Sequence, residues 1–421
     1  MKKMLSVTFF TGLLTLSRMM AGFIISKFIA VYTGANGMAL LGQTQNLITI
    51  LNGIVSAPVG NALVRYTSEN NQDGYQRCVP WWRASIAWAM IFCSISVPVG
   101  VICSRKISNL LLDSDEFVWL ICIIFIGLPF SALSTAINSI INGLQNYKRY
   151  VSLGIISIVI STIVMLVLII LYDVRGALIA VGIQSSLIGI ILFTVNIRQP
   201  WLNFKMWLGS FGLVHFKGVS EYILMAITAA VSMPLALMIV RKIIIYHEGW
   251  NAAGQWQAVW KISEVYLSVI TTSLGIYFLP QLSKLNKVEL IKEEIKKSIK
   301  LIIPVSVCMA FGIYFLRDII ITVLFTDSFR PARDLFMMQL IGDVLKVVSW
   351  VYAYPMIAKG ITRWFIISEI IFATLFALLT LILVPIYHAN GANIAYAINY
   401  FCYLIFVYFG MQYFLSKKMR S

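Results

Sequence analysis

Long apolar stretches separated by short polar segments fill most of the chain. A helix crosses a membrane core of about 30 Å with about 20 apolar residues, and a window of that length finds twelve such stretches. They are 8–32, 37–60, 84–104, 117–143, 150–172, 176–196, 218–240, 252–279, 301–316, 335–358, 363–386 and 392–415. The pattern therefore predicts an all-α membrane protein with twelve transmembrane helices.

Two of the connecting segments are longer than the others. Segment 197–217 mixes tryptophan and phenylalanine with basic residues, a pattern typical of a segment that lies along the membrane surface. It leaves six spans on each side, so we predict an N-terminal six-helix lobe at 1–196, a cytoplasmic interfacial linker at 197–217 and a C-terminal six-helix lobe at 218–421. Segment 281–300 carries apolar residues at helical spacing and is predicted to be an amphipathic connecting helix.

Composition and charge support this class and set an orientation. The chain is 60% hydrophobic and 12% charged with a mean hydropathy of +0.86, whereas soluble domains carry about 25% charged residues. The predicted connections on the side of the two termini hold 21 Lys and Arg, and those on the other side hold 8, Arg241 among them. The positive-inside rule then places both termini in the cytoplasm. The formal charge of +16 is explained by orientation and attraction to anionic membrane lipid, without nucleic-acid binding.

The six cysteines are scattered without the Cys-x-x-Cys spacing of metal or redox sites. The three histidines also lie singly. No metal site, cofactor or catalytic residue is therefore expected.

Charged residues inside the predicted spans are the best candidates for function. Each costs about 2.5–3.5 kcal/mol at the centre of a bilayer, so such residues usually face a bundle interior or a wet cavity. They are Arg18, Lys27, Glu221, Lys261, Glu264, Asp343, Lys346 and Glu369.

Two spans carry these charges in stripes. Gln257, Lys261 and Glu264 share one face of the eighth span, and Asp343 and Lys346 share one face of the tenth. Each stripe holds an acid and a base three residues apart. One interpretation is that each pair neutralises itself as a structural ion pair.

The other interpretation is an anion site. Arg18 lies on a polar face of the first span, and Arg18, Lys261 and Lys346 all fall near mid-depth at a rise of about 1.5 Å per residue. Three cations at one level suit a diphosphate, whose oxygens match guanidinium and ammonium donors. Lys27 lies off that face near the outer end of the span, where its long side chain can reach the interface.

Uncharged and acidic residues extend the candidate set. Gln45 and Asn52 share a face of the second span and Asn138 lies on a polar face of the fourth, which suits either sugar hydroxyls in a wet cavity or hydrogen bonds between helices. Glu221 lies near the cytoplasmic rim and is interpreted as a gate residue. Glu369 is a lone acid, which either couples transport to a proton or Na⁺ or pairs with a neighbouring base.

Several stretches resemble Wzx-type flippases, especially the enterobacterial lipid III flippase branch. They are WQAVWKISEVYLSVITTSLGIYFLPQLSKL (256–285), LRD (316–318) and RDLFMMQLIGDVLKVVSWVYAYPMIAKG (333–360). The N-terminal half resembles this group in Arg18, Lys27 and VYTGANGMALLGQTQNLITIL (31–51). Lys261 departs from the pattern of that branch.

The resemblance implies the fold of the multidrug/oligosaccharidyl-lipid/polysaccharide (MOP) exporter superfamily, with two six-helix lobes around a central cavity. It implies a transporter in the bacterial inner membrane that moves an undecaprenyl-diphosphate-linked oligosaccharide, an O-antigen repeat unit or lipid III, to the periplasmic leaflet by alternating access. Association with a glycan polymerase and a chain-length regulator is also implied. Among the residues, it supports Arg18, Asp343 and Lys346, and Lys27 more weakly.

Two other functions stay open from the sequence. A cation-coupled multidrug exporter of the same superfamily would favour an acidic or aromatic cavity. A membrane glycan polymerase or acyltransferase would need a reactive cluster at the membrane surface, often on a long external loop, and the predicted external loops are short.

Overall fold

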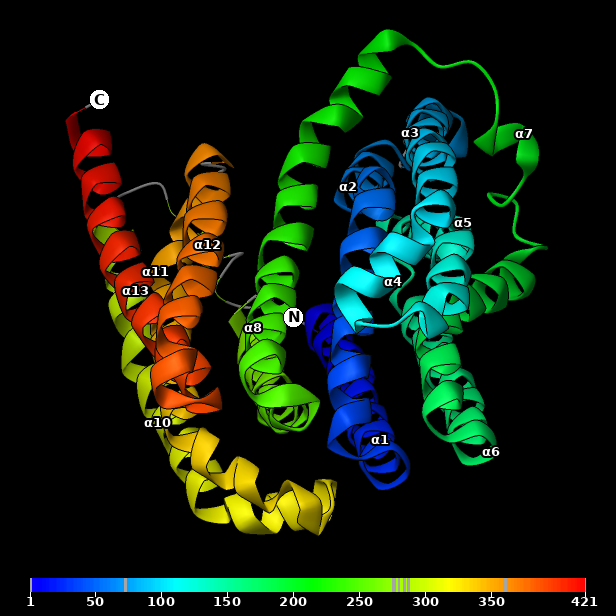
Figure 1. Cartoon of the computed structure of the whole chain (residues 1–421). Coiled ribbons are helices and arrows are strands. Elements are labelled where there is room, and N and C mark those ends of the chain that lie inside the picture. Colours follow the sequence, from blue (N-terminus) through cyan, green and yellow to red (C-terminus); the bar gives the residue numbers. More distant parts are fainter. Residues whose placement is uncertain are drawn as a thin grey trace. The chain divides into compact units, whose positions relative to one another are not determined.

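A computed structural model describes residues 2–71, 74–274, 278, 281–282, 285, 288–358 and 362–420. α-Helices make up nearly all of these ranges (Figure 1). The N-terminal elements are α1 (Lys2–Ser56), η1 (Ala57–Val59), α2 (Asn61–Asn70), α3 (Tyr75–Ile102), α4 (Ser104–Leu112), η3 (Asp115–Phe117), α5 (Val118–Gly143), α6 (Tyr147–Asn196) and α7 (Phe204–Trp207). They are followed by α8 (Leu213–Ser273), α10 (Val288–Leu324), η5 (Asp327–Leu335), α11 (Phe336–Ala358), α12 (Thr362–Tyr387) and α13 (Ala389–Arg420).

Nine helices in the described ranges are long and apolar enough to span a membrane. Three of them, α1, α6 and α8, contain 55, 50 and 61 residues, far more than the roughly 20 that one crossing needs. Each is interrupted by a residue with positive φ, namely Gly34 (62°), Asp173 (47°) and Gly249 (81°). Glycine adopts this conformation without a Cβ clash, and aspartate tolerates it better than most residues. These breaks fall in the gaps that the sequence predicts between consecutive spans.

Two compact units make up the chain. Unit 1 comprises Met1–Tyr32 and Leu41–Leu235, and unit 2 comprises Thr33–Leu40 and Ala236–Ser421. The division between them falls inside α8, so this helix begins in one unit and ends in the other. The predicted lobes, with a linker at 197–217, stay a prediction.

In unit 1, α5 packs along α6 and also contacts α2 and α3. Three alanines in the core of this unit let helices approach closely, as small residues do where helices pack inside membranes. This core consists of Ala57, Ala62, Ala84, Val219 and Ile223.

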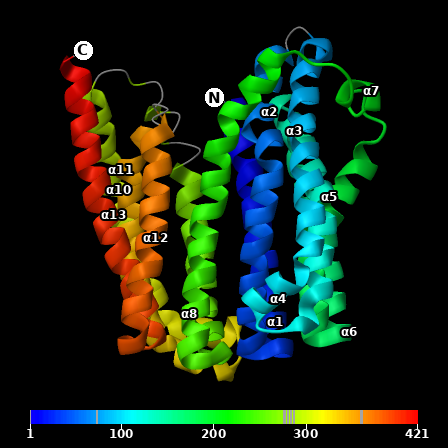
Figure 2. The same ribbon diagram turned by 45° about the horizontal axis from the view of Figure 1, so that its top comes forward.

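In unit 2, α11 packs against α10 and α13, and α12 packs against α13 (Figure 2). The amphipathic character predicted for the connecting helix is confirmed from Val288 onward. Val288, Ile291 and Ile295 are buried, while Glu293 and Lys297 form an exposed ion pair at 2.9 Å.

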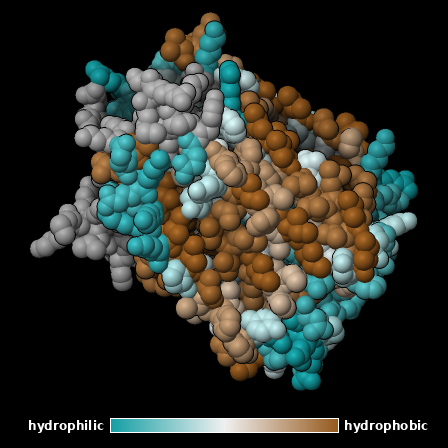
Figure 3. All heavy atoms as spheres, turned by 90° about the vertical axis from the view of Figure 1, so that its left-hand side faces the viewer, coloured by the Kyte–Doolittle hydropathy of each residue, from teal (hydrophilic) through white to brown (hydrophobic). Residues whose placement is uncertain are grey.

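Large hydrophobic side chains are exposed over much of the helical surface. On the face drawn in Figure 3, they fill a broad central area, and hydrophilic residues gather toward its margins. On α12 and α13 they include Ile367, Leu378, Ile382, Phe401 and Phe409. A soluble monomer rarely exposes so large an apolar area, so this surface suits contact with lipid.

Gly254 in α8 lies against the segment of α1 that belongs to unit 2. A Cβ at this position would lie 1.8 Å from the carbonyl oxygen of Ala35. We expect Gly254→Ala to lower the thermal unfolding temperature of the purified protein, because overpacking costs about 1–3 kcal/mol. The matched control is Gly312→Ala in α10, where a Cβ meets no described atom within 4 Å. An equal effect of both substitutions would contradict this close approach.

Candidate functional site

Asp343 of α11 is the centre of a polar cluster inside unit 2. Its side chain is 0% exposed. Its Oδ2 accepts hydrogen bonds from Ser263 Oγ (2.6 Å) and Tyr266 Oη (2.7 Å) of α8. Its Oδ1 accepts from Tyr396 Oη of α13 (2.9 Å) and Gln339 Nε2 (3.3 Å). These donors offset part of the desolvation cost of the carboxylate, which is otherwise several kcal/mol, and they join three helices at one point.

Lys346 lies one helical turn after Asp343 and is surrounded by aromatic rings. Its Nζ lies 5.1–5.6 Å from four ring centroids. The rings belong to Trp260, Trp350, Tyr396 and Tyr400. A cation over an aromatic face gains about 0.5–1 kcal/mol, and about 2 kcal/mol when desolvated. The half-buried ammonium group is therefore held by an aromatic cage, defined by these four rings, from α8, α11 and α13.

The predicted i+3 pairs differ from each other. Lys261 and Glu264 form an ion pair at 3.2 Å, and Glu264 also accepts a hydrogen bond from Trp260 Nε1 at 3.0 Å. Asp343 and Lys346 interact electrostatically, but in the described structure each takes its direct contacts from other residues. The interpretation as a structural ion pair thus fits Lys261 with Glu264.

Two further carboxylates interact with Lys346. Glu264 and Glu369 both attract Lys346 electrostatically, and Glu369 of α12 also interacts with Tyr400 and Tyr403. Glu369 is half-buried, so it is not an isolated acid but part of the same cluster.

Arg241 is a functional candidate that the sequence analysis missed. Hydropathy ended the seventh span at residue 240 and counted Arg241 with the external loop, but α8 continues and Arg241 is only 1% exposed. It donates a hydrogen bond to the buried Gln257 and lies 5.6 Å from the ring centroid of Trp256. Arg241 and Gln257 are each eight residues from Gly249, so a hairpin at that glycine brings them together. Their equal spacing from a glycine between two spans is the signal that could have indicated this pair.

The polar cluster in unit 2 holds three bases and three acids, so its own formal charges balance. Arg241 interacts electrostatically with Glu264, which links it to the charges around Lys346. The bases are Arg241, Lys261 and Lys346, and the acids are Glu264, Asp343 and Glu369.

The remaining candidates lie mostly in unit 1. Arg18 is exposed on α1, Lys27 and Gln45 are half-buried on the same helix, and Asn138 is half-buried on α5. The Oδ1 of Asn52 is buried with no hydrogen-bond partner among the described residues. The side chain of Glu221 lies outside the described part of the structure. Since Arg18 belongs to unit 1 while Lys261 and Lys346 belong to unit 2, the anion site that would join these cations stays a prediction.

Residues 39–334, more than half of the chain, match the family model described as polysaccharide biosynthesis protein. The chain belongs to this family. Among its curated relatives are the lipid III flippases of Escherichia coli (strain K12) and Shigella flexneri. Each is 29% identical to it over 407 residues, which cover 93% of this chain and 94% of the relative. The family expected from the sequence is confirmed.

Solved structures of MOP superfamily transporters share the fold of this polysaccharide biosynthesis protein. An inward-facing multidrug resistance MATE family transporter matches 100% of this chain and 99% of its own, with a TM-score of 0.75 and 13% identity. A MOP superfamily transporter from Pyrococcus furiosus matches 99% of this chain and 95% of its own, with a TM-score of 0.63 and 13% identity. The MOP fold implied by the sequence resemblance is confirmed.

Removing Gln257 should destabilise the protein through Arg241. Gln257→Leu leaves a buried guanidinium short of an acceptor, which costs about 1–3 kcal/mol or more for a charged group. We expect a lower thermal unfolding temperature for this variant in detergent. The double variant Arg241→Met with Gln257→Leu should recover most of the loss, because the charge is removed with its partner. Additive losses in the double variant would show that the pair is not coupled.

Proposed function

We propose that this protein is a flippase for a lipid-linked oligosaccharide. The observation that carries the proposal is the 29% identity to lipid III flippases over nearly the full length of both chains. The substrate we infer is an oligosaccharide on undecaprenyl diphosphate, either an O-antigen repeat unit or lipid III. It would move from the cytoplasmic to the periplasmic leaflet of the bacterial inner membrane by alternating access.

The proposed topology has twelve crossings and two cytoplasmic termini. Nine long helices with three interruptions support twelve crossings, and an even number puts both termini on one side. The excess of Lys and Arg on that side supports the cytoplasm. Two lobes of six helices, joined through 197–217, would then move against each other about a central cavity.

The diphosphate would bind to cations contributed by both lobes. Arg18 is exposed on α1 and carries the planar guanidinium that matches phosphate oxygens. Lys346 is half-buried, and Lys261 is partly neutralised by Glu264. We therefore assign the largest share of head-group binding to Arg18, with Lys346, Lys261 and Lys27 as further contributors.

The sugars would contact the uncharged polar residues. The buried Asn52 Oδ1, which has no donor among the residues that the structure describes, is stabilised when a ligand hydroxyl donates to it. Gln45 and Asn138, also half-buried in unit 1, are proposed to serve the same glycan. Gln257 is committed to Arg241, so it is a weaker candidate than these three.

Coupling to a proton or Na⁺ is proposed to use the acids of unit 2. A cluster whose formal charges balance responds strongly when one carboxylate gains or loses a cation, because the neighbouring charges are then no longer matched. Glu369 and Glu264 both interact with Lys346, so a change at either would alter the cage. Glu221 is proposed as a gate residue nearer the cytoplasm.

A cation-coupled multidrug exporter is the alternative supported by the shared MOP fold. Aromatic cages commonly bind organic cations, which would suit such a substrate. Here Lys346 already occupies the cage, so an organic cation would have to displace a tethered ammonium group. This observation favours the flippase over the exporter. The similarity to lipid III flippases favours the flippase over a membrane glycan polymerase or acyltransferase. Association with a glycan polymerase and a chain-length regulator is part of the proposal.

Complementation of strains that each lack one defined flippase tests this function. The wild-type protein should restore the surface glycan of at least one strain, and Arg18→Ala and Lys346→Ala should not restore it at equal membrane levels. Arg18→Lys should retain part of the activity, because the charge remains without the guanidinium fork. Lys106→Ala, which removes an exposed charge on α4, is the matched control. Full restoration by Arg18→Ala and Lys346→Ala would refute the cation site, and drug resistance without any glycan phenotype would favour the exporter.

The coupling role of Glu369 can be measured in vesicles that contain the purified protein and a lipid-linked oligosaccharide. Flipping by the wild type should be faster under an imposed proton or Na⁺ gradient. Glu369→Gln should remove this acceleration while Glu116→Gln, at an exposed position in η3, keeps it. Unchanged gradient dependence in Glu369→Gln would rule out this residue as the coupling site.

A further inference from the structure

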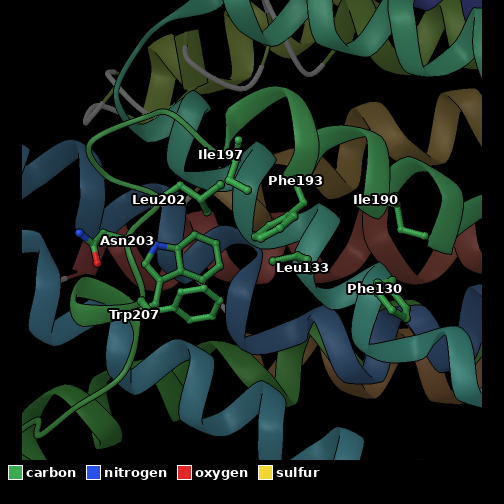
Figure 4. A pocket seen from close by; sticks show the side chains of 9 residues that line it. Phe130, Leu133, Ile190, Phe193, Ile197, Leu202, Asn203 and Trp207 are labelled. Carbon is green, nitrogen blue, oxygen red and sulfur yellow. The ribbon is translucent and has the colours of Figure 1, made fainter.

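Unit 1 contains an apolar pocket that is unrelated to the charged residues described above. Its volume is about 610 Å³, within the range of about 300–1,000 Å³ typical of ligand sites. Figure 4 shows its lining side chains. They are Phe130, Leu133, Ile190, Phe193, Ile197, Leu202, Asn203, Phe204 and Trp207.

The pocket is elongated along two helices. Ile190 and Phe193 of α6 and Ile197, which directly follows this helix, are spaced three and four residues apart, so they extend about 10 Å along the helix axis. Phe130 and Leu133 of α5 add one turn of a second helix. In Figure 4, Trp207 faces Leu202, Phe193 and Leu133, while Phe130 and Ile190 lie farther along the pocket. This shape suits an extended hydrocarbon chain better than a compact molecule.

One end of the pocket is built by the connection between α6 and α8. Trp207 Nε1 donates a hydrogen bond to the carbonyl oxygen of Trp201 at 2.9 Å, and Trp201 is 2% exposed. Asn203 Oδ1 accepts from the backbone N–H of Lys205 at 3.0 Å and caps α7. Arg83 of α3 donates to the carbonyl oxygens of Lys205 (2.6 Å) and Ser210 (3.1 Å). The indole ring is therefore fixed by the hydrogen bond that it donates within this connection, and Arg83 ties the backbone on both sides of Trp207 to α3.

The surroundings of this pocket are positively charged. No Asp or Glu occurs in 117–172 or 174–220, the stretches that supply all of its lining residues. Arg198 and Lys205 are exposed and directly follow the lining residues Ile197 and Phe204. Basic residues at the end of an apolar membrane groove recognise anionic lipid head groups, and the nearby tryptophans are typical of the membrane interface.

We propose that this pocket binds an acyl chain of an anionic phospholipid, with the phosphate of the head group at Arg198 and Lys205. The apolar wall of α5 and α6 takes the chain, and Trp207 closes the end nearest the head group. Because the connection from α6 to α8 forms part of the pocket wall, the bound lipid stabilises the packing of this connection against the rest of unit 1. The site is separate from the proposed flippase substrate, and its test does not depend on transport.

Photolabelling of the full-length protein tests the site. The protein is reconstituted in phosphatidylcholine vesicles that contain phosphatidylglycerol with a photoreactive acyl chain, and labelled peptides are mapped by mass spectrometry. Labelling should concentrate in the peptides that contain the lining residues of α5, α6 and 202–207. Leu133→Trp, which fills the pocket, should reduce it several-fold. Ile163→Trp, at a lipid-exposed position of α6 outside the pocket, should leave it unchanged.

A second pair of variants tests the head-group contact. Arg198→Gln with Lys205→Gln should reduce labelling by the phosphatidylglycerol probe several-fold and should not affect a phosphatidylcholine probe. Arg105→Gln with Lys106→Gln, on α4, serves as the charge-matched control. If Leu133→Trp does not fold, Ile190→Trp at the exposed end of the pocket replaces it.

Three results would overturn the proposal. The first is equal labelling of the pocket by phosphatidylglycerol and phosphatidylcholine probes, which would leave no anionic selectivity. The second is labelling that persists when the pocket is filled, and the third is displacement of the probe by a polyprenyl phosphate but not by phosphatidylglycerol. Complementation by the same variants measures flippase function independently, so failure of one proposal is distinguishable from failure of the other.

Discussion

Burial of the Asp343 carboxylate constrains how three helices of unit 2 pack together. A carboxylate in the low-dielectric interior of a membrane protein must receive hydrogen bonds at both oxygens, or its desolvation outweighs what packing contributes. Here the donors come from α8, α11 and α13. The three helices must therefore keep their relative rotation and depth for the carboxylate to remain satisfied. Tyr396 also contributes its ring to the cage of Lys346, so the acid and the base share one helix contact.

Because Tyr396 contacts both Asp343 and Lys346, the charges of the cluster are linked to the positions of the helices that carry it. A change in the charge of Asp343, Glu369 or Glu264 alters the attraction on Lys346, and the rings that hold Lys346 belong to three helices. A cation arriving at the cluster can thus affect packing throughout unit 2 without a large movement at its own binding site. The cluster is better suited to coupling than to binding a diphosphate, since its formal charges already balance. We therefore propose that head-group binding depends mainly on Arg18 in unit 1.

The sequence predicted the helices well and the side-chain partners less well. The twelve predicted stretches fall on the nine long helices that the structure describes, and three of these helices hold two stretches each with a break between them. A break in a helix needs residues such as Gly34 and Gly249 that tolerate positive φ. The facial stripes placed Asp343 and Lys346 on one helix face, and in the structure the two interact electrostatically. They did not reveal the tyrosine donors and the aromatic cage, since a hydropathy pattern counts Tyr266 and Tyr396 as apolar. The partners come from different helices, and their contacts depend on tertiary packing.

Two other features, the burial of Arg241 and the pocket of unit 1, were not predicted from the sequence. Arg241 ended a predicted span because its charge lowers the local hydropathy, although the helix continues and buries the side chain against Gln257. The pocket of unit 1 depends on the fold of 202–207 between two long helices, where no periodic pattern exists. Local hydrophobicity identifies segments, whereas buried charges and pockets depend on how those segments meet.

Translocation by the purified protein is the sharpest test of the proposed flippase activity. Vesicles with and without the protein would receive a fluorescent undecaprenyl-diphosphate oligosaccharide, and a membrane-impermeant quencher would report how much remains in the outer leaflet. We expect the protein to speed exchange of this lipid between leaflets, and free oligosaccharide to compete weakly, because the diphosphate is recognised with the glycan. The proposed flippase activity would be contradicted if vesicles with folded protein exchanged the lipid no faster than protein-free vesicles, under an imposed proton gradient and under an imposed Na⁺ gradient.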